Sequence, residues 1–392
     1  MQILMYQWNA YNGPDIRATF LALGHRVTDF KARFKDANRD SAFEQQLSEY
    51  FTADKYDMVF SVDYFTLISN VCEQHHIRYV SWSCDAALTS MYNRSIYNTC
   101  NYLFLFDKVD YLEFADKGLA HVYYLPLAPA LERTQQVIHS NPDNADELTL
   151  VQKKYAHDIS FVGTLYGKNK YDTMVDSFSP YLKGYLDAVI EAQLNVSGGN
   201  LIETLLTPGI LEEIETHYKL EQQPESEANL AMYFSRSVLG YKVAAEERFR
   251  ALQILGRKHM VTLYSSEPAP EQLRIEQAGP VDYWQEMPHV FHDSKINLNI
   301  TIPNISSGIP LRVWDILAAG GFCLTNYRPE LLQYFENGKD LVIYEGLDDL
   351  REKVDYYLSH EEEREQIALN GFRKVQQHSL EKRLQELLTL FC

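Results

Sequence analysis

The sequence predicts an α/β protein made of two doubly wound halves, each built on a parallel β-sheet. Short apolar runs alternate with helical patterns through the first third of the chain, and a second alternating series starts at His157. This alternation is typical of βαβ units, in which crossover helices join parallel strands. The chain has 392 residues, which is enough for two domains of ordinary size.

In the first half, apolar runs predict strands and the periodic stretches between them predict helices. The strands are expected at Gln2–Tyr6, His25–Phe30, Met58–Val62, Arg78–Trp82, Tyr102–Phe106 and Val122–Leu125. The helices are expected at Asp15–Leu23, Ala42–Phe51, Phe65–His75 and Tyr111–Lys117. Residues 132–154 are polar and acidic, which predicts a linker after an N-terminal domain of residues 1–135.

The second half predicts a domain over residues 155–370 with a helical insertion. Residues 171–256 have helical spacing almost throughout, too long for one crossover helix, so we expect an inserted region at about 171–230. Further strands are expected at His259–Tyr264, Gly279–Val281, Ile296–Ile300, Phe322–Thr325 and Leu341–Tyr344. The rest of the second half, after the last of these strands, is expected to form charged helices.

The net charge and the cysteine content indicate which partners and which cellular compartment are expected. The net charge of −18 argues against nucleic acid or an anionic membrane, because both favour basic surfaces. The five cysteines show no metal-ligand spacing, which predicts free thiols and a cytoplasmic protein. We expect neither a signal peptide nor a transmembrane segment, since no apolar run reaches ~18 residues. The histidines form no ligand set, so no metal site is expected.

The stretch Ile296–Tyr327 combines a strand, a tight polar turn, a helix, a Gly-Gly break and a strand. The turn ends in Ser307-Gly308-Ile309, and the following helix carries Arg312 and Asp315. A helix N-terminus offers free N–H groups and a positive dipole end, which suits a diphosphate. Arg312 adds a planar fork of donors for phosphate, and Asp315 can accept from sugar hydroxyls. An ordinary βαβ connection with a surface Arg and Asp explains the spacing equally well.

A second glycine-bearing turn, Phe161–Lys168, follows the first strand of the second half. Gly163 would let the backbone approach a ligand, and Lys168 or Lys170 would neutralise a phosphate. The spacing fits neither a Walker loop nor GxGxxG, and a turn with solvated lysines is an equal alternative. Tyr264 ends another strand and can contact a nucleotide, although a simple turn is favoured there.

Asp85 follows the fourth predicted strand of the first half. A carboxylate at the carboxyl end of a strand faces the edge where ligands bind in open sheets, and it can orient or deprotonate a hydroxyl. Asp followed by Ala-Ala-Leu also suits a helix N-cap, and the two roles do not exclude each other. Cys84 has no His–Asn partner pattern, which argues against a thiol nucleophile.

Several stretches together resemble the spore-maturation CgeB-like family of GT-B glycosyltransferases. They are SWSCDAA, FLFDKVDYLEFADKG, YYLPLA, DISFVGTLYGK, EERFRALQILG, LYSS, SKINLNIT and RVWDILAAGGF. The resemblance covers nearly the whole chain apart from residues 171–230, and it implies two Rossmann-like domains facing each other across a cleft. It also implies a nucleotide-sugar on the second domain, an acceptor on the first, and a final helix at 371–392 that packs back on the first.

In the related retaining enzymes, a Glu-x7-Glu motif marks the donor site. Asp315 stands at the second acidic position, which in those enzymes binds ribose, whereas the first falls on Ser307. The Arg that often follows the first strand of the second domain falls on Thr164, while a nearby Lys is kept at Lys168 or Lys170. The resemblance therefore implies a donor site with altered contacts.

We therefore expect a metal-independent glycosyltransferase that uses a nucleotide-sugar and retains the anomeric configuration. The expected diphosphate ligands are Ser307, Gly308, Ile309, Arg312 and Lys168, with Gly163 and Thr164 beside them. Asp315 is expected to bind ribose, Tyr264 and Val281 to lie near the base, and Asp85 to face the acceptor, so that Asp85 and Arg312 are the candidate catalytic residues.

No cofactor is expected besides the donor substrate, which can be a UDP, GDP or dTDP sugar. The acceptor can be a protein, a polysaccharide or a lipid-linked glycan. Two alternatives stay open: an epimerase-like enzyme of the same fold, and a non-catalytic binding or assembly protein.

Overall fold

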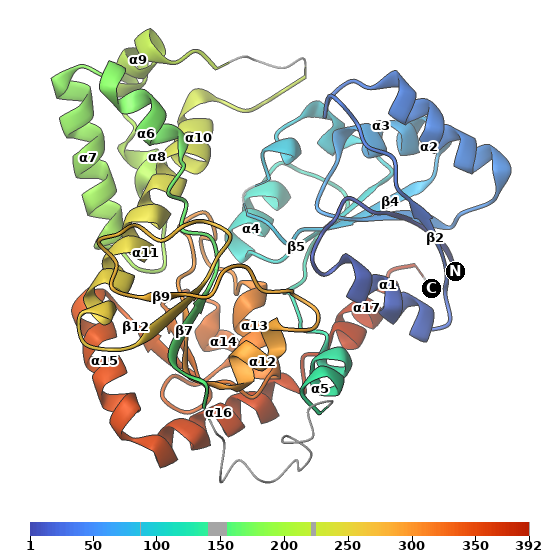
Figure 1. The fold of residues 1–392 in the computed structure, drawn as a ribbon. Coiled ribbons are helices and arrows are strands. Elements are labelled where there is room, and N and C mark those ends of the chain that lie inside the picture. Colours follow the sequence, from blue (N-terminus) through green and yellow to red (C-terminus); the bar gives the residue numbers. More distant parts are fainter. Residues whose placement is uncertain (87, 140–154, 221–224, 392) are drawn as a thin grey trace. The chain divides into compact units, whose positions relative to one another are not determined.

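The computed structural model describes residues 1–86, 88–139, 155–220 and 225–391, which group into two compact units (Figure 1). Unit 1 consists of Met1–Leu127, Leu220–Tyr233 and Leu380–Cys392, and unit 2 of Ala128–Lys219 and Phe234–Ser379. Each unit contains one six-stranded parallel sheet with helices. The predicted α/β class with two Rossmann-like domains is therefore confirmed.

The sheet of unit 1 has the strand order β2-β1-β3-β4-β5-β6, and all neighbouring strands are parallel. The strands are β1 (Gln2–Tyr6), β2 (Arg26–Phe30), β3 (Met58–Val62), β4 (Arg78–Trp82), β5 (Asn101–Leu105) and β6 (Val122–Tyr124). The helices are α1 (Gly13–Ala22), α2 (Ser41–Ala53), α3 (Thr66–His75), α4 (Lys108–Asp116) and α17 (Leu380–Leu388). Two 3-10 turns, η1 (Thr89–Met91) and η2 (Arg94–Tyr97), precede β5.

Continuous apolar runs form these strands because both faces of a parallel sheet are covered by helices. Every residue of β3 is buried. Phe60 of β3 contacts Phe20 of α1, with ring centroids 5.1 Å apart. Val59 points to the opposite face, where it belongs to a cluster with Phe43 and Leu47 of α2. The C-terminal helix α17 packs beside α1 within the same unit (Figure 1).

The sheet of unit 2 has the order β12-β11-β10-β7-β8-β9 and is also parallel throughout. Its strands are β7 (His157–Val162), β8 (Val261–Tyr264), β9 (Glu276–Gln277), β10 (Ser294–Asn299), β11 (Cys323–Asn326) and β12 (Val342–Tyr344). The helices around it are α5 (Leu131–His139), α12 (Met287–His292), α13 (Leu311–Ala318), α14 (Leu331–Tyr334), α15 (Leu347–Ser359) and α16 (Glu361–Val375).

A helical region separates β7 from β8, as the sequence predicts. It contains α6 (Lys170–Met174), η5 (Val175–Ser177), α7 (Pro180–Leu194), α8 (Ile202–Leu205), α9 (Pro208–His217), α10 (Leu230–Phe234), a π-helical turn η6 (Ser235–Leu239) and α11 (Gly240–Gly256). Residues 220–233 of this region group with unit 1, whereas its remainder groups with unit 2.

Two local predictions were wrong. The start of the predicted linker forms α5, because Thr134, Val137 and Ile138 give this polar segment a buried face; residues 140–154 lie outside the described part of the chain. The predicted strand Gly279–Val281 is not formed, since β9 lies just before it and Gly279 adopts a φ of +84°, which breaks the extended backbone.

Among the helices that the structure describes, none combines the length and apolarity of a membrane span.

A close helix-to-backbone approach in unit 2 gives a stability prediction. A Cβ at Gly371 of α16 would collide with the carbonyl oxygen of Asp340 and with the side chain of Leu317. Gly371→Ala should therefore lower the free energy of unfolding by about 1–3 kcal/mol, although alanine is the better helix former. The measurement is the midpoint of denaturant-induced unfolding.

The matched control is Gly184→Ala in α7, where the added methyl group meets no atom within 4 Å. That variant should gain about 0.5–1 kcal/mol from helix propensity alone. A Gly371→Ala protein as stable as the parent would contradict the proposed steric conflict.

Candidate functional site

The strand order of the second sheet reverses between β7 and β10. From β7 the sheet continues through β8 and β9, whereas β10 leads to β11 and β12 on the other side. Open parallel sheets bind ligands outside the carboxyl ends of their strands at such a switch point. Two loops leave the sheet here, residues 163–169 after β7 and residues 300–310 after β10, and they contain most of the residues predicted to bind a donor.

Two guanidinium groups hold the start of these loops. Arg248 of α11 is 8% exposed, and it donates to the carbonyl oxygen of Thr164 and, at 2.8 Å, to that of Ile300. Arg312, in the first turn of α13, donates from Nη1 to the carbonyl oxygen of Val162 at 2.6 Å. Two positive charges are therefore fixed around the carboxyl end of β7.

The loop after β7 is also tied to the segment that follows β8. The N–H of Gly163 donates to the carbonyl oxygen of Tyr264 at 3.0 Å. The N–H of Gly167 donates to the carboxylate of Glu267 at 3.0 Å. Lys168, next to Gly167 in the same loop, is exposed.

The loop after β10 is buried along the tripeptide Ser307-Gly308-Ile309. The hydroxyl of Ser307 donates to the carboxylate of Glu330 at 2.6 Å, and the N–H of Glu330 donates back to the carbonyl oxygen of Ser307 at 3.1 Å. Glu330 is 1% exposed and precedes α14. A buried carboxylate therefore lies beside the position where the related enzymes have their first acidic residue.

Asp315 is buried in α13, with 7% of its surface exposed. Its two carboxylate oxygens lie 3.2 and 3.4 Å from the hydroxyl of Tyr283, which donates to them. The guanidinium of Arg133 lies over the Tyr283 ring at 5.1 Å. Val281 is half-buried in the loop that carries Tyr283, so this loop and Asp315 are neighbours.

The side chain of Tyr264 is directed elsewhere. Its hydroxyl lies 2.9 Å from Nε2 of His157, the first residue of β7. The Tyr264 ring therefore extends back along the sheet. Only the backbone of Tyr264 contacts Gly163, through the hydrogen bond described above.

Asp85 belongs to unit 1, after β4. The structure contradicts the alternative role as a helix N-cap, because the element that follows in the described chain is the short turn η1, whose N-cap is Leu88. The N–H groups of Cys84 and Asp85 donate to Oδ1 of Asp63 at 2.8 and 3.2 Å. Asp63, which follows β3, thus orients the segment that carries Asp85.

Asp63 and Asp85 form a carboxyl pair at the carboxyl ends of neighbouring strands. Asp63 is 3% exposed and adopts a φ of +60°, an uncommon backbone conformation for a residue other than glycine. Burial and the nearby charge of Asp85 raise the pKa of Asp63 to about 7, and burial also raises the pKa of Asp85. Such a pair can hold a single proton near neutral pH.

Arg248, Glu330 and Asp63 were not among the predicted site residues. Asp63 had a usable signal, since it directly follows a buried strand next to that of Asp85. Arg248 and Glu330 gave none, because each is one charged residue among many and is placed by contacts distant in sequence. Among the described residues, no cluster of His, Cys, Asp or Glu could hold a metal ion.

Residues 243–389 match a family model described as glycosyl transferase-like. This range begins in α11 and includes strands β8 to β12 together with Arg248, Arg312, Asp315 and Glu330. No curated protein sequence matches the chain. The match supports glycosyl transfer, and the finer CgeB-like assignment stays a prediction.

Solved structures resemble the chain along nearly its whole length. Sucrose-phosphate synthase from Thermosynechococcus elongatus has 9% identity and a TM-score of 0.54, over 100% of this chain and 98% of that one. The UDP-forming α,α-trehalose-phosphate synthase from Burkholderia xenovorans has 11% identity and a TM-score of 0.52, over 99% and 98%. Anabaena HepE in complex with UDP-glucose has 8% identity and a TM-score of 0.50, over 100% and 99%.

The chain has the GT-B fold. In this GT-B protein, unit 2 carries Gly163, Thr164, Lys168 and the residues of α13, whereas Asp85 lies in unit 1. The predicted donor residues thus share one unit, and the predicted acceptor residue belongs to the other.

The Asp63–Asp85 pair predicts a specific pH dependence of stability. Folding raises the pKa of Asp63 from its usual 3.8 to about 7, so within this window the folded state retains a proton that the unfolded chain has lost. This contribution to stability is complete below the pKa of the unfolded state and is lost as the pH rises through the pKa of the folded state. Asp63→Asn removes the titrating carboxyl group. Between pH 3.8 and about 7, the free energy of unfolding of the variant should therefore fall less steeply with pH than that of the parent. The two slopes should differ by up to about 1.4 kcal/mol per pH unit.

Denaturant unfolding at several pH values measures this difference. The control is Asp116→Asn, a change at an exposed aspartate of the same unit, which should keep the parent slope. An Asp63→Asn protein with the parent's pH dependence would refute the assignment.

Proposed function

We propose that this GT-B protein is a glycosyltransferase that moves a sugar from a nucleoside diphosphate to an acceptor hydroxyl. The observation that carries the proposal is the glycosyl transferase-like match over residues 243–389, which includes β10 and the loop after it on one side of the switch point of the second sheet. Two proteins of similar fold support the donor class, since one was solved with UDP-glucose and the other is described as UDP-forming.

The donor is proposed to bind at the loops around β7 and β10. Arg312, Lys168 and the backbone of Ser307-Gly308-Ile309 would hold the diphosphate, with Gly163 allowing its close approach and Thr164 beside it. Glu330 would contribute a carboxylate next to Ser307, in place of the first acidic residue of related enzymes.

Asp315 is proposed to bind the ribose. Because the Tyr283 hydroxyl already donates to this carboxylate, the ribose hydroxyls would share or replace that hydrogen bond. The loop that contains Val281 then lies close to the base, and Tyr264 contributes through its backbone.

Catalysis is proposed to rest on electrostatic stabilisation of the leaving diphosphate. When the bond between the anomeric carbon and the phosphate oxygen breaks, negative charge develops on the diphosphate. The fixed guanidinium groups of Arg248 and Arg312 already lie at the end of β7, so they need no reorganisation to stabilise that charge. They supply what a divalent cation supplies elsewhere, and no cofactor is proposed.

Asp85 is proposed to orient the acceptor hydroxyl by accepting its hydrogen bond, with Asp63 as its positioning residue. In a transfer with retention, the acceptor oxygen bonds to the anomeric carbon and its proton leaves with the diphosphate.

The acceptor class is proposed as a protein, a polysaccharide or a lipid-linked glycan. A hexosyl donor, the CgeB-like family and a cytoplasmic location belong to the same proposal.

The first test measures thermal unfolding in the presence of UDP, GDP, dTDP, CDP or ADP, with and without EDTA. We expect one diphosphate to raise the melting temperature equally in both conditions, with UDP the first expectation. A free diphosphate concentration of a hundred times Kd should add about 2.7 kcal/mol to the free energy of unfolding. The matching nucleotide-sugar should also be hydrolysed slowly.

Absence of any shift, or binding without donor hydrolysis, would favour the non-catalytic alternative. A shift abolished by EDTA would contradict metal independence.

The second test concerns Arg312. Arg312→Ala removes one fixed charge and one hydrogen bond to the β7 carbonyl, so donor kcat/KM should fall by about tenfold to a hundredfold. Arg312→Lys keeps the charge and should recover part of the loss. Arg257→Ala is the control, because Arg257 is exposed just after α11; normal donor kinetics in Arg312→Ala would remove Arg312 from the site.

A further inference from the structure

One residue of the loop after β7 has a strained backbone that the proposed donor contacts do not explain. Tyr166 adopts a φ of +55°, a left-handed conformation that is a genuine outlier for a bulky residue. Such a conformation costs free energy, and it persists only where the surrounding structure determines it. The contacts of Tyr166 therefore show which parts of unit 2 hold this loop.

The ring of Tyr166 lies against the guanidinium group of Arg248. The guanidinium carbon is 4.7 Å from the centre of the half-buried ring, and the ring of Tyr241 of α11 lies 5.2 Å from it. An arginine cation is attracted to the face of an aromatic ring, more strongly when both are shielded from water. Because Arg248 donates to the carbonyl oxygens of Thr164 and Ile300, the Tyr166 ring supports the group that joins the loops after β7 and β10.

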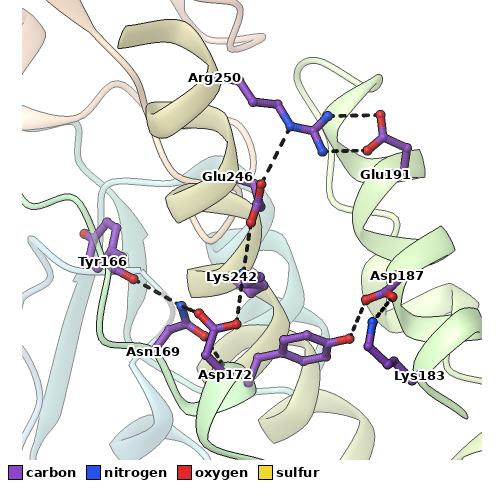
Figure 2. Close-up of polar contacts among 10 residues, drawn as sticks. Tyr166, Asn169, Asp172, Lys183, Asp187, Glu191, Lys242, Glu246 and Arg250 are labelled. Carbon is purple, nitrogen blue, oxygen red and sulfur yellow. Dashed lines mark hydrogen bonds and ion pairs between the residues drawn. The ribbon is translucent and has the colours of Figure 1, made fainter. Parts of the chain in front are cut away.

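The carbonyl group of Tyr166 is held by Asn169, the N-cap residue of α6. Nδ2 of Asn169 donates to this carbonyl oxygen at 3.2 Å and to the carboxylate of Asp172 at 2.8 Å (Figure 2). Oδ1 of Asn169 accepts from the N–H of Asp172 at 3.0 Å, which is the capping bond of the helix. Asn169 is 7% exposed, so the strained backbone is tied to the start of α6 by a buried amide.

Ion pairs connect Asp172 to α11 and α7. Nζ of Lys242 lies 2.9 Å from a carboxylate oxygen of Asp172 and 2.9 Å from one of Glu246. Arg250 lies 3.7 Å from Glu246 and forms two hydrogen bonds to Glu191 of α7, at 2.9 and 3.1 Å. Figure 2 shows these charges alternating in sign from α6 to α7. The side chain of Lys242 is 17% exposed, the least of the five, and it is the charge that joins α6 to α11.

We propose that Tyr166 and Lys242 are positioning residues of the sugar-transfer centre. The Tyr166 ring fixes the guanidinium group of Arg248. Lys242 fixes Asp172, and through it the Asn169 amide that holds the strained carbonyl group. The inference rests on the proposed function, since it gives these residues a role in donor binding and turnover.

This arrangement gives the helical region between β7 and β8 a part in the reaction. A loop that is already ordered loses little conformational entropy when the donor binds. A guanidinium group that is already oriented needs no reorganisation when charge develops on the leaving diphosphate. Loss of the Lys242 charge should therefore weaken donor binding, whereas loss of the Tyr166 ring should also slow turnover.

The kinetics of donor hydrolysis by the full chain test the inference. UDP-glucose, GDP-mannose and dTDP-glucose are screened, and KM and kcat are measured with the one that the parent hydrolyses. Lys242→Met should raise KM about threefold with little change in kcat. Tyr166→Leu should lower kcat/KM by about tenfold, and a fall in kcat should account for part of that loss.

Conservative variants and matched controls separate positioning from general destabilisation. Lys242→Arg keeps the charge and Tyr166→Phe keeps the ring, so each should recover most of the parent kinetics. Lys258→Met removes one partner of an exposed ion pair with Asp355, at 2.8 Å. Tyr181→Leu removes a ring that is 67% exposed on α7. Both controls should have the kinetics of the parent.

Hydrogen–deuterium exchange of the ligand-free proteins measures the order of the loop without reference to catalysis. The amides of residues 163–169 should exchange faster in Lys242→Met and Tyr166→Leu than in the parent. Those of β12 should be unchanged, because β12 lies at the far edge of the same sheet from β9.

Parent kinetics in Tyr166→Leu, or a loss that Tyr166→Phe does not restore, would overturn the inference while the transferase function stands. A parent that binds no diphosphate and hydrolyses no nucleotide-sugar would overturn the proposed function, and with it the role in transfer. Unchanged exchange of residues 163–169 in both variants would overturn the positioning roles in either case.

Discussion

The buried guanidinium of Arg248 is the interaction on which the carboxyl edge of the second sheet depends. Burying a charge is costly unless it is hydrogen-bonded, and here Nη1 and Nη2 donate to the carbonyl oxygens of Thr164 and Ile300, on two different loops, whereas Nε has no partner among the described residues. The separation of the two loops is therefore set by one rigid planar group. Arg312 adds a bond to Val162, so the two loops and α13 are fixed before any ligand is present.

The strands were predictable to within one or two residues over most of the two sheets, because a strand buried on both faces is a continuous apolar run. Within the candidate site, the sequence located Arg312 and Asp315 through the turn and helix that carry them. It could not supply Tyr283 as the partner of Asp315, since this contact joins segments far apart in the chain, whereas the position of Asp63 directly after the strand next to that of Asp85 was a signal that could have been used. The polar composition of residues 132–139 also concealed the buried face of α5.

Ser307 shows how a motif position and its spatial position can differ. Along the sequence, the hydroxyl of Ser307 stands where the resemblance to retaining GT-B enzymes implies an acid. In the fold, the carboxylate of Glu330, 23 residues later, accepts a hydrogen bond from that hydroxyl. Negative charge is therefore retained next to the turn, although it comes from the segment after β11. Loss of an acidic residue from a motif thus need not mean loss of the carboxylate from the site.

Unit 1 is assembled from three separate stretches of chain, and the last of them begins at Leu380, after all of unit 2. On the ribosome, β1 to β6 are therefore made before unit 2, whereas the helix that packs beside α1 is made after it. Until then, α1 lacks its neighbouring helix α17. Completion of the first unit must wait for synthesis of the second, which makes this interval the stage at which a chaperone or a stalled ribosome would have the greatest effect on folding.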